Sequence, residues 1–193
     1  ADYEFTTQSD KPDAIIVRTL NMHEYSLPES VLAVSRAGAG TNNIPVADYA
    51  ARGVVVFNTP GANANAVKEL VLASLLMSGR RIVDGIEWVK TLKGSEGLSK
   101  AVESGKKAYV GKEISEKTLG IIGLGAIGIL VANAAIDLGM SVVGVDPYLS
   151  TANALRLNPA VRILPDTDAL LEASDFVTIH VPYNESTKYT INA

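Results

Sequence analysis

The motif Gly123-Leu124-Gly125-Ala126-Ile127-Gly128 constrains the fold of this chain more than any other feature. An apolar run over 118–122 precedes it, and an apolar helical pattern over 126–138 follows it and ends at Gly139. A second apolar run over 141–145 then ends in Asp146. This order predicts a strand, a tight glycine turn, a helix and a second strand parallel to the first.

A turn of this kind has the chemistry of a dinucleotide site. Gly123 permits the tight turn out of the strand, Gly125 leaves room for a pyrophosphate against the backbone, and Gly128 lets the helix sit close to the strand. The free N–H groups and positive dipole end of the helix favour phosphate. Asp146, near the expected spacing of about 20 residues, can accept hydrogen bonds from both ribose hydroxyls and repels a 2′-phosphate. The pattern therefore predicts NAD rather than NADP, and the alternative is a glycine-rich turn without a ligand.

Short apolar runs and helical patterns alternate along the rest of the chain. The predicted strands cover 14–17, 32–35, 54–57, 161–164 and 176–180, and the predicted helices cover 64–93, 151–157 and 166–173. Residues 93–107 are rich in Gly, Ser and Lys, which indicates an exposed connection. The alternation predicts an α/β fold with a parallel, doubly wound sheet.

Composition excludes several classes of protein. Of the 193 residues 47% are hydrophobic, which excludes a disordered chain, and the net charge of −4 argues against broad electrostatic binding of nucleic acid. Cysteine is absent and His23 and His180 lie far apart, so we expect neither disulfides nor a metal site. Residues 118–136 carry no charge, yet their glycines favour a buried strand and helix over a membrane span. We expect a cytoplasmic protein without a signal peptide.

Several long motifs resemble the family of D-isomer-specific 2-hydroxyacid dehydrogenases, in that family's order. They are DAIIVRT (13–19), SRAGAGTNNIPV (35–46), GVVVFNTPGANANAVKELVLA (53–73), EKTLGIIGLGAIG (116–128) and HVPYNESTKYTINA (180–193). The resemblance implies an incomplete flavodoxin-like substrate domain over 1–59 and an incomplete Rossmann NAD-binding domain over 60–193. It also implies NAD as cofactor, a small 2-hydroxy acid as substrate and a homodimer, which the apolar stretch 67–77 favours independently.

The resemblance assigns roles to the positions that match the family's motifs. The implied substrate-binding residues are Arg18, Thr19, Gly38, Gly40 and Asn63. The implied cofactor-binding residues are Ala39, Gly123, Gly125, Ala126, Ile127, Gly128, Asp146, Val181 and Thr187. Two alternatives stay open, because Arg18 can be a surface residue at a strand end and Asn63 can simply begin a helix. For His180 we favour a role in shaping the cofactor cleft over that of a catalytic base.

Within the family, the motifs are most similar to those of members that oxidise 3-phosphoglycerate to 3-phosphohydroxypyruvate for serine biosynthesis. The alternatives are another substrate, such as glyoxylate, hydroxypyruvate or lactate, and a non-enzymatic protein that senses NAD. The family's catalytic arginine, glutamate and histidine fall beyond Ala193, so no catalytic residue is assigned in this chain. We therefore expect a fragment, shortened at both ends, that binds NAD weakly and does not turn over.

Overall fold

A computed structural model describes residues 4–190 and 192 of the chain. Internal contacts divide the chain into two compact units, Ala1–Asn63 (unit 1) and Ala64–Ala193 (unit 2). This division lies four residues after the domain boundary expected at residue 59.

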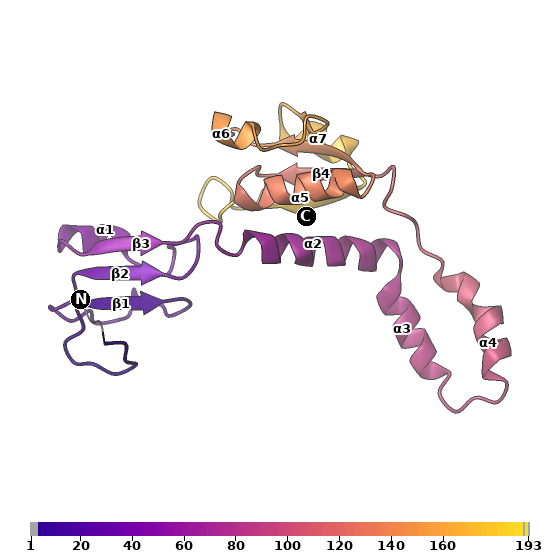
Figure 1. The fold of residues 1–193 in the computed structure, drawn as a ribbon, viewed down its shortest axis with the longest axis horizontal. Coiled ribbons are helices and arrows are strands. Elements are labelled where there is room, and N and C mark those ends of the chain that lie inside the picture. Colours follow the sequence, from indigo (N-terminus) through magenta and orange to yellow (C-terminus); the bar gives the residue numbers. More distant parts are fainter. Residues whose placement is uncertain (1–3, 191, 193) are drawn as a thin grey trace. The chain divides into compact units, whose positions relative to one another are not determined.

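Unit 1 contains a parallel three-stranded sheet in the order β1 (Ala14–Val17), β2 (Ala33–Arg36) and β3 (Val55–Asn58) (Figure 1). Strands β2 and β3 each begin one residue later than predicted. The sequence did not predict helix α1 (Val46–Ala51), which has only six residues and buries one of them, Tyr49. The core of the unit consists of Val17, Met22, Leu27, Val31, Val34, Ile44, Tyr49 and Val54.

Unit 2 contains a parallel four-stranded sheet formed by β4 (Thr118–Ile122), β5 (Ser141–Val145), β6 (Arg162–Ile163) and β7 (Phe176–Ile179). The strand order is β6-β5-β4-β7, so the chain winds outward from β4 first in one direction and then in the other. This order confirms the predicted parallel, doubly wound sheet. Its helices include α5 (Ala126–Asp137), α6 (Thr151–Ala154) and α7 (Thr167–Ala173), and α6 is shorter than the predicted 151–157 because its last three residues form a turn.

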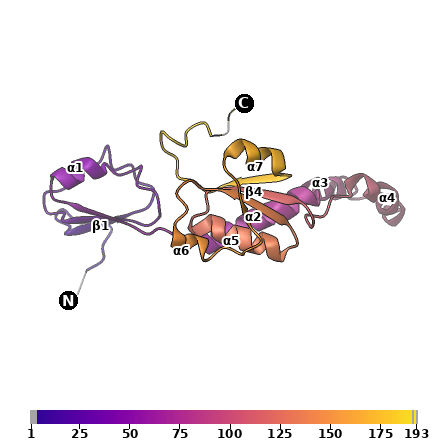
Figure 2. The same ribbon diagram turned by 90° about the horizontal axis from the view of Figure 1, so that it is seen from above.

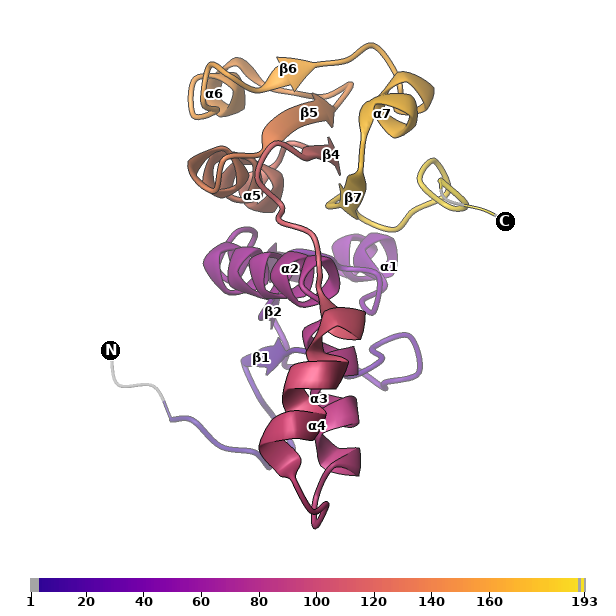
Figure 3. The same cartoon turned by 90° about the vertical axis from the view of Figure 1, so that its right-hand side faces the viewer.

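Helices cover both faces of the unit 2 sheet. Helix α2 (Ala64–Gly79) packs along α5, and both contribute to a core with β4 and β5 (Figures 1 and 3). On the other face, Leu170 of α7 packs against Ile122, Val143 and Val145. The uncharged run 118–136 is divided between β4 and α5. Over the described residues, no helix combines the length and apolar character that a membrane crossing needs.

The predicted helix over 64–93 is wrong, because it is two helices, α2 and α3 (Ile82–Thr91). Arg81, at the start of α3, has a left-handed backbone with φ 52°. Beside this junction, the carbonyl of Gly79 accepts a hydrogen bond at 2.7 Å from the N–H of Lys112, which lies on the segment that returns toward the sheet. Because this tertiary hydrogen bond satisfies a carbonyl at the end of α2, the helix can stop without a capping side chain.

Residues 93–107 are mostly exposed, as predicted for a connection, but they contain helices that the sequence did not predict. Helix α4 (Leu98–Gly105) and the 3-10 helix η1 (Lys106–Tyr109) lie in this stretch. Leu98, Ala101 and Val102 have helical spacing, which the surrounding Gly, Ser and Lys residues obscured. We call residues 82–109 the helical arm, and it extends from the sheet of unit 2 (Figure 2).

Candidate functional site

The carboxyl ends of β4 and β7 separate at Gly123, which is the centre of the candidate site. The Gly123 N–H donates to the Val145 carbonyl at 2.9 Å, and the His180 N–H donates to the Ile122 carbonyl at 2.7 Å. Gly123 has φ 94°, and a Cβ there would lie 2.8 Å from Val181 Cγ1 and 2.9 Å from the His180 carbonyl. Only glycine fits this turn. The turn also lies where the strand order reverses, which is where doubly wound sheets bind their ligands.

The two following glycines have different surroundings. Gly125 is extended, with φ −82° and ψ −156°, and no atom lies within 4 Å of the position of a Cβ. Gly128 is buried, and a Cβ there would overlap the carbonyl of Gly123. Helix α5 therefore starts tightly against the turn, with Ala126 exposed and Ile127 half-buried at its first positions. The first N–H groups of a helix have no intrahelical acceptor, so they can receive a phosphate at the open side of Gly125.

Asp146 follows β5 and is half-buried beside this turn. Its Oδ2 accepts a hydrogen bond from the Leu124 N–H at 2.9 Å, and its Oδ1 accepts one from the Tyr148 N–H at 2.8 Å. Each carboxylate oxygen keeps a further lone pair for a hydroxyl donor. The cradle at Gly125 and the carboxylate at Asp146 thus fit the phosphates and ribose of a dinucleotide.

His180 and Thr187 lie on the chain that leaves β7. Burial lowers the pKa of His180 below its ordinary value, and its Nε2 lies 3.0 Å from Thr178 Oγ1. The Thr187 hydroxyl accepts a hydrogen bond from the Asn184 N–H at 2.9 Å and also donates to the Pro182 carbonyl. Because both functions of this hydroxyl hold the loop together, the contact of Thr187 with a cofactor stays a prediction.

Unit 1 carries a second polar feature, the loop Gly38–Gly40 at the end of β2. Asn58 Nδ2 donates to the Ala39 carbonyl at 2.7 Å, and the Thr59 N–H donates to the Gly38 carbonyl at 3.0 Å. Within residues 4–190 and 192, the N–H groups of Ala39 and Gly40 donate to no protein acceptor. The loop thus has its carbonyls fixed and N–H groups available, which is the arrangement of an anion-binding nest.

Sequence reasoning missed Arg36, the last residue of β2. Its guanidinium lies against this loop, because a Cβ on Gly38 would lie 2.7 Å from Arg36 Cζ. In the described part of the chain, its Nε is buried without a hydrogen-bond partner. A buried donor without an acceptor is costly, so it indicates a functional use of the cation. The signal in the sequence was an arginine two residues before the first loop glycine.

The remaining predicted substrate residues are all exposed. Arg18 and Thr19 follow β1, and the adjoining Val17 carbonyl accepts a hydrogen bond from the Ala37 N–H at 2.8 Å. The ends of β1 and β2, and with them Arg18 and the glycine loop, therefore share one edge of the sheet. Asn63 lies in the turn before α2 and has no hydrogen bond to the loop among the described residues. Across the same described residues, no three carboxylate or imidazole side chains gather as metal ligands.

Comparisons with known proteins agree with this geometry. Residues 72–193 match the family model described as D-isomer specific 2-hydroxyacid dehydrogenase, NAD binding domain. D-3-phosphoglycerate dehydrogenase of Synechocystis sp. is 36% identical over 160 residues, which are 83% of this chain and 26% of that protein. Hydroxypyruvate reductase of Thermotoga maritima is 36% identical over 183 residues, which are 93% of this chain and 55% of that protein. The chain thus spans about a quarter to a half of the length of these relatives.

Solved structures give the same result. Apo D-mandelate dehydrogenase of Rhodotorula graminis has a TM-score of 0.74 at 26% identity, covering 93% of this chain and 54% of that one. D-lactate dehydrogenase of Aquifex aeolicus, solved with NAD and lactic acid, has a TM-score of 0.76 at 25% identity, covering 95% and 52%. The chain belongs to the D-isomer specific 2-hydroxyacid dehydrogenase family, and its residues 72–193 are the part that matches the family's NAD-binding domain.

Proposed function

We propose that this chain is the cofactor-binding part of an oxidoreductase that oxidises a D-2-hydroxy acid with NAD. The observation that carries the proposal is the close approach of the Gly123 turn to Val181, together with the hydrogen bond from the Leu124 N–H to the half-buried carboxylate of Asp146. When bound, NAD supplies the hydride acceptor. The backbone at Gly125 and the start of α5 bind the pyrophosphate, and Asp146 binds the adenosine ribose.

Fluorescence titration with NADH and NADPH tests the cofactor site. We expect NADH to bind more tightly, because the Asp146 carboxylate repels a 2′-phosphate. Asp146→Ser should weaken NADH binding and reduce the preference for NADH. Equal affinities for both cofactors in the unaltered chain would contradict the role of Asp146.

The favoured substrate is 3-phosphoglycerate, with 3-phosphohydroxypyruvate as product. Its two anionic groups match the two arginines, Arg18 and Arg36, that β1 and β2 bring to the edge carrying the Gly38–Gly40 loop. The names of D-3-phosphoglycerate dehydrogenase among the relatives support this choice, whereas those of hydroxypyruvate reductase and D-lactate dehydrogenase support a substrate without phosphate.

Initial rates on the protein that carries this sequence separate these substrates. NADH formation should be faster with 3-phosphoglycerate than with D-glycerate or D-lactate, and the reduction of hydroxypyruvate and glyoxylate is measured in parallel. Arg18→Ala should raise the KM for the phosphorylated substrate. NADH binding without turnover of any of these acids would instead favour a non-enzymatic NAD sensor.

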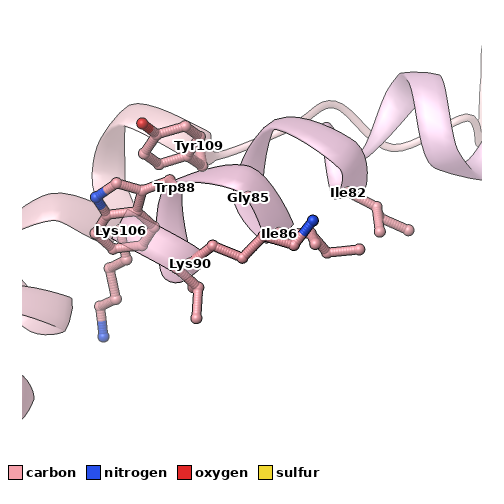
Figure 4. A pocket seen from close by; sticks show the side chains of 8 residues that line it. Ile82, Gly85, Ile86, Trp88, Lys90, Lys106 and Tyr109 are labelled. Carbon is pink, nitrogen blue, oxygen red and sulfur yellow. The ribbon is translucent and has the colours of Figure 1, made fainter. Parts of the chain in front are cut away.

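We propose further that two copies of the protein pair through the helical arm. Helices α3 and α4 bury none of their residues, although Ile82, Val83, Ile86, Val89 and Leu98 are apolar and 41–53% exposed. The Trp88 and Tyr109 rings stack with centroids 4.7 Å apart and line an open groove of about 540 Å³, whose walls are mostly apolar and also include Lys90 and Lys106 (Figure 4). An apolar surface of this kind on a projecting arm is typical of a protein interface, and a second copy meets it with the same surface.

Sedimentation equilibrium tests this pairing. Ile86→Asp places a charge in the groove and should convert the dimer to a monomer. Glu96→Lys, in the loop between α3 and α4, is the matched control and should leave the dimer intact. A monomeric unaltered protein would contradict the pairing.

A further inference from the structure

The side chain of Leu124 lies beneath the glycine turn and connects it to the core. Leu124 stands between Gly123 and Gly125, yet its side chain is 0% exposed and belongs to the main core of unit 2. Its N–H donates to Asp146 Oδ2 at 2.9 Å. One residue thus holds the turn from both sides, through its backbone at the site and through its side chain in the core.

The space that receives this side chain exists because residue 144, in β5, is glycine. A Cβ on Gly144 would lie 2.9 Å from Leu124 Cδ1, 3.1 Å from Cδ2 and 3.3 Å from Cγ. All three distances are shorter than an ordinary van der Waals contact. Because Cγ is crowded as well as both methyl groups, a rotation about χ2 alone cannot relieve the overlap. Because the core around Leu124 is close-packed, we expect the overlap to displace Leu124 and the turn that it belongs to.

We propose that Gly144 is a positioning residue for the cofactor, because it provides the space in which Leu124 fixes the height of the Gly123–Gly125 turn. Gly144 itself contacts no ligand in this arrangement. It acts through Leu124, whose backbone lies between the two glycines that shape the pyrophosphate site. The proposal rests on the dinucleotide site proposed above and adds a determinant that lies in a neighbouring strand.

The sheet offers a matched control at Gly120 in β4. A Cβ on Gly120 would meet Ser174 Oγ at 2.3 Å, Leu170 Cδ2 at 2.6 Å and Leu170 Cγ at 3.0 Å. Leu170 is also 0% exposed, but it lies on α7, on the opposite face of the sheet from α5. Both the Gly120→Ala and the Gly144→Ala variant therefore place a methyl group against a buried leucine. The clash at Gly120 is the more severe, and only Gly144→Ala places it beneath the turn.

The experiment measures NADH affinity and thermal stability of the purified chain and of three variants. Gly144→Ala should weaken NADH binding about tenfold at a temperature well below unfolding. Gly120→Ala should lower the melting temperature without changing the NADH affinity. The double variant Gly144→Ala with Leu124→Val adds one carbon and removes one, so it should recover affinity to within about threefold of the unaltered chain.

A second readout needs no cofactor. The amide signals of Gly123 and Gly125 in NMR spectra of the ligand-free chain should shift in Gly144→Ala, return toward their original positions in the double variant, and stay in place in Gly120→Ala. Unshifted signals in Gly144→Ala, or an NADH affinity that falls equally in both single variants, would overturn the positioning role. If the unaltered chain fails to bind NADH, the cofactor proposal fails, and the amide signals still decide whether Gly144 positions the turn.

Discussion

Gly125 and Gly128 lie three residues apart, yet replacing Gly125 with alanine should leave stability almost unchanged, whereas replacing Gly128 should lower it. The new methyl group of Gly125→Ala enters open space, and the backbone is already extended, so the free energy of unfolding should change by less than about 0.5 kcal/mol. The methyl group of Gly128→Ala overlaps the carbonyl of Gly123. Because backbone atoms cannot rotate away, this overpacking should cost about 2 kcal/mol or more, which for a unit of this size lowers the melting temperature by about 7 °C.

Gly125→Ala should weaken cofactor binding even though it leaves stability almost unchanged. The open space at Gly125 is where a pyrophosphate approaches the backbone, so the methyl group of Gly125→Ala displaces the phosphates from their N–H donors. The loss of one charge-assisted hydrogen bond costs about 1.5–3 kcal/mol, or about 10- to 150-fold in the NADH dissociation constant. Thermal denaturation and fluorescence titration on the same samples give both quantities. A Gly125→Ala variant that binds NADH as tightly as the unaltered chain would refute the placement of the phosphates.

Two further predictions concern the titration of His180 and the role of Arg36 beside the Gly38–Gly40 loop. Burial lowers the pKa of His180 in the folded chain below 6.5, so the unfolded chain binds more protons as the pH falls below 6.5, and the stability contribution of neutral His180 is lost over that range. His180→Gln should therefore flatten the decline of the melting temperature between about pH 7 and pH 5, and an unchanged slope would exclude His180 as its cause. Arg36→Met should raise the KM for an anionic substrate. It should not lower the melting temperature, because the buried Nε of Arg36 has no partner among the described residues. A marked loss of stability would show that Arg36 is structural.

The parts of the fold that the sequence predicted well depend on local steric constraints. Gly123 and Gly128 follow a strand and accompany a helix at spacings that allow few alternatives, and β4, α5 and β5 lie where the pattern predicted them. The break between α2 and α3 depends instead on the hydrogen bond from Lys112 to Gly79, two residues that are distant in the sequence. A periodic pattern in one segment contains no information about such a partner, so the segment reads as one long helix.

The same distinction applies to the candidate sites. Gly125 and Asp146 could be found because their motif states both the spacing and the chemistry. Arg36 could not, because its importance follows from tertiary structure: β3 fixes the carbonyls of the Gly38–Gly40 loop, and the buried Nε of Arg36 has no acceptor in the described residues. In both units the unused hydrogen-bonding capacity collects at the carboxyl ends of parallel strands, where ladder pairing stops. Because these donors have no acceptor among the described protein atoms, an anionic ligand is the partner to which they can donate hydrogen bonds.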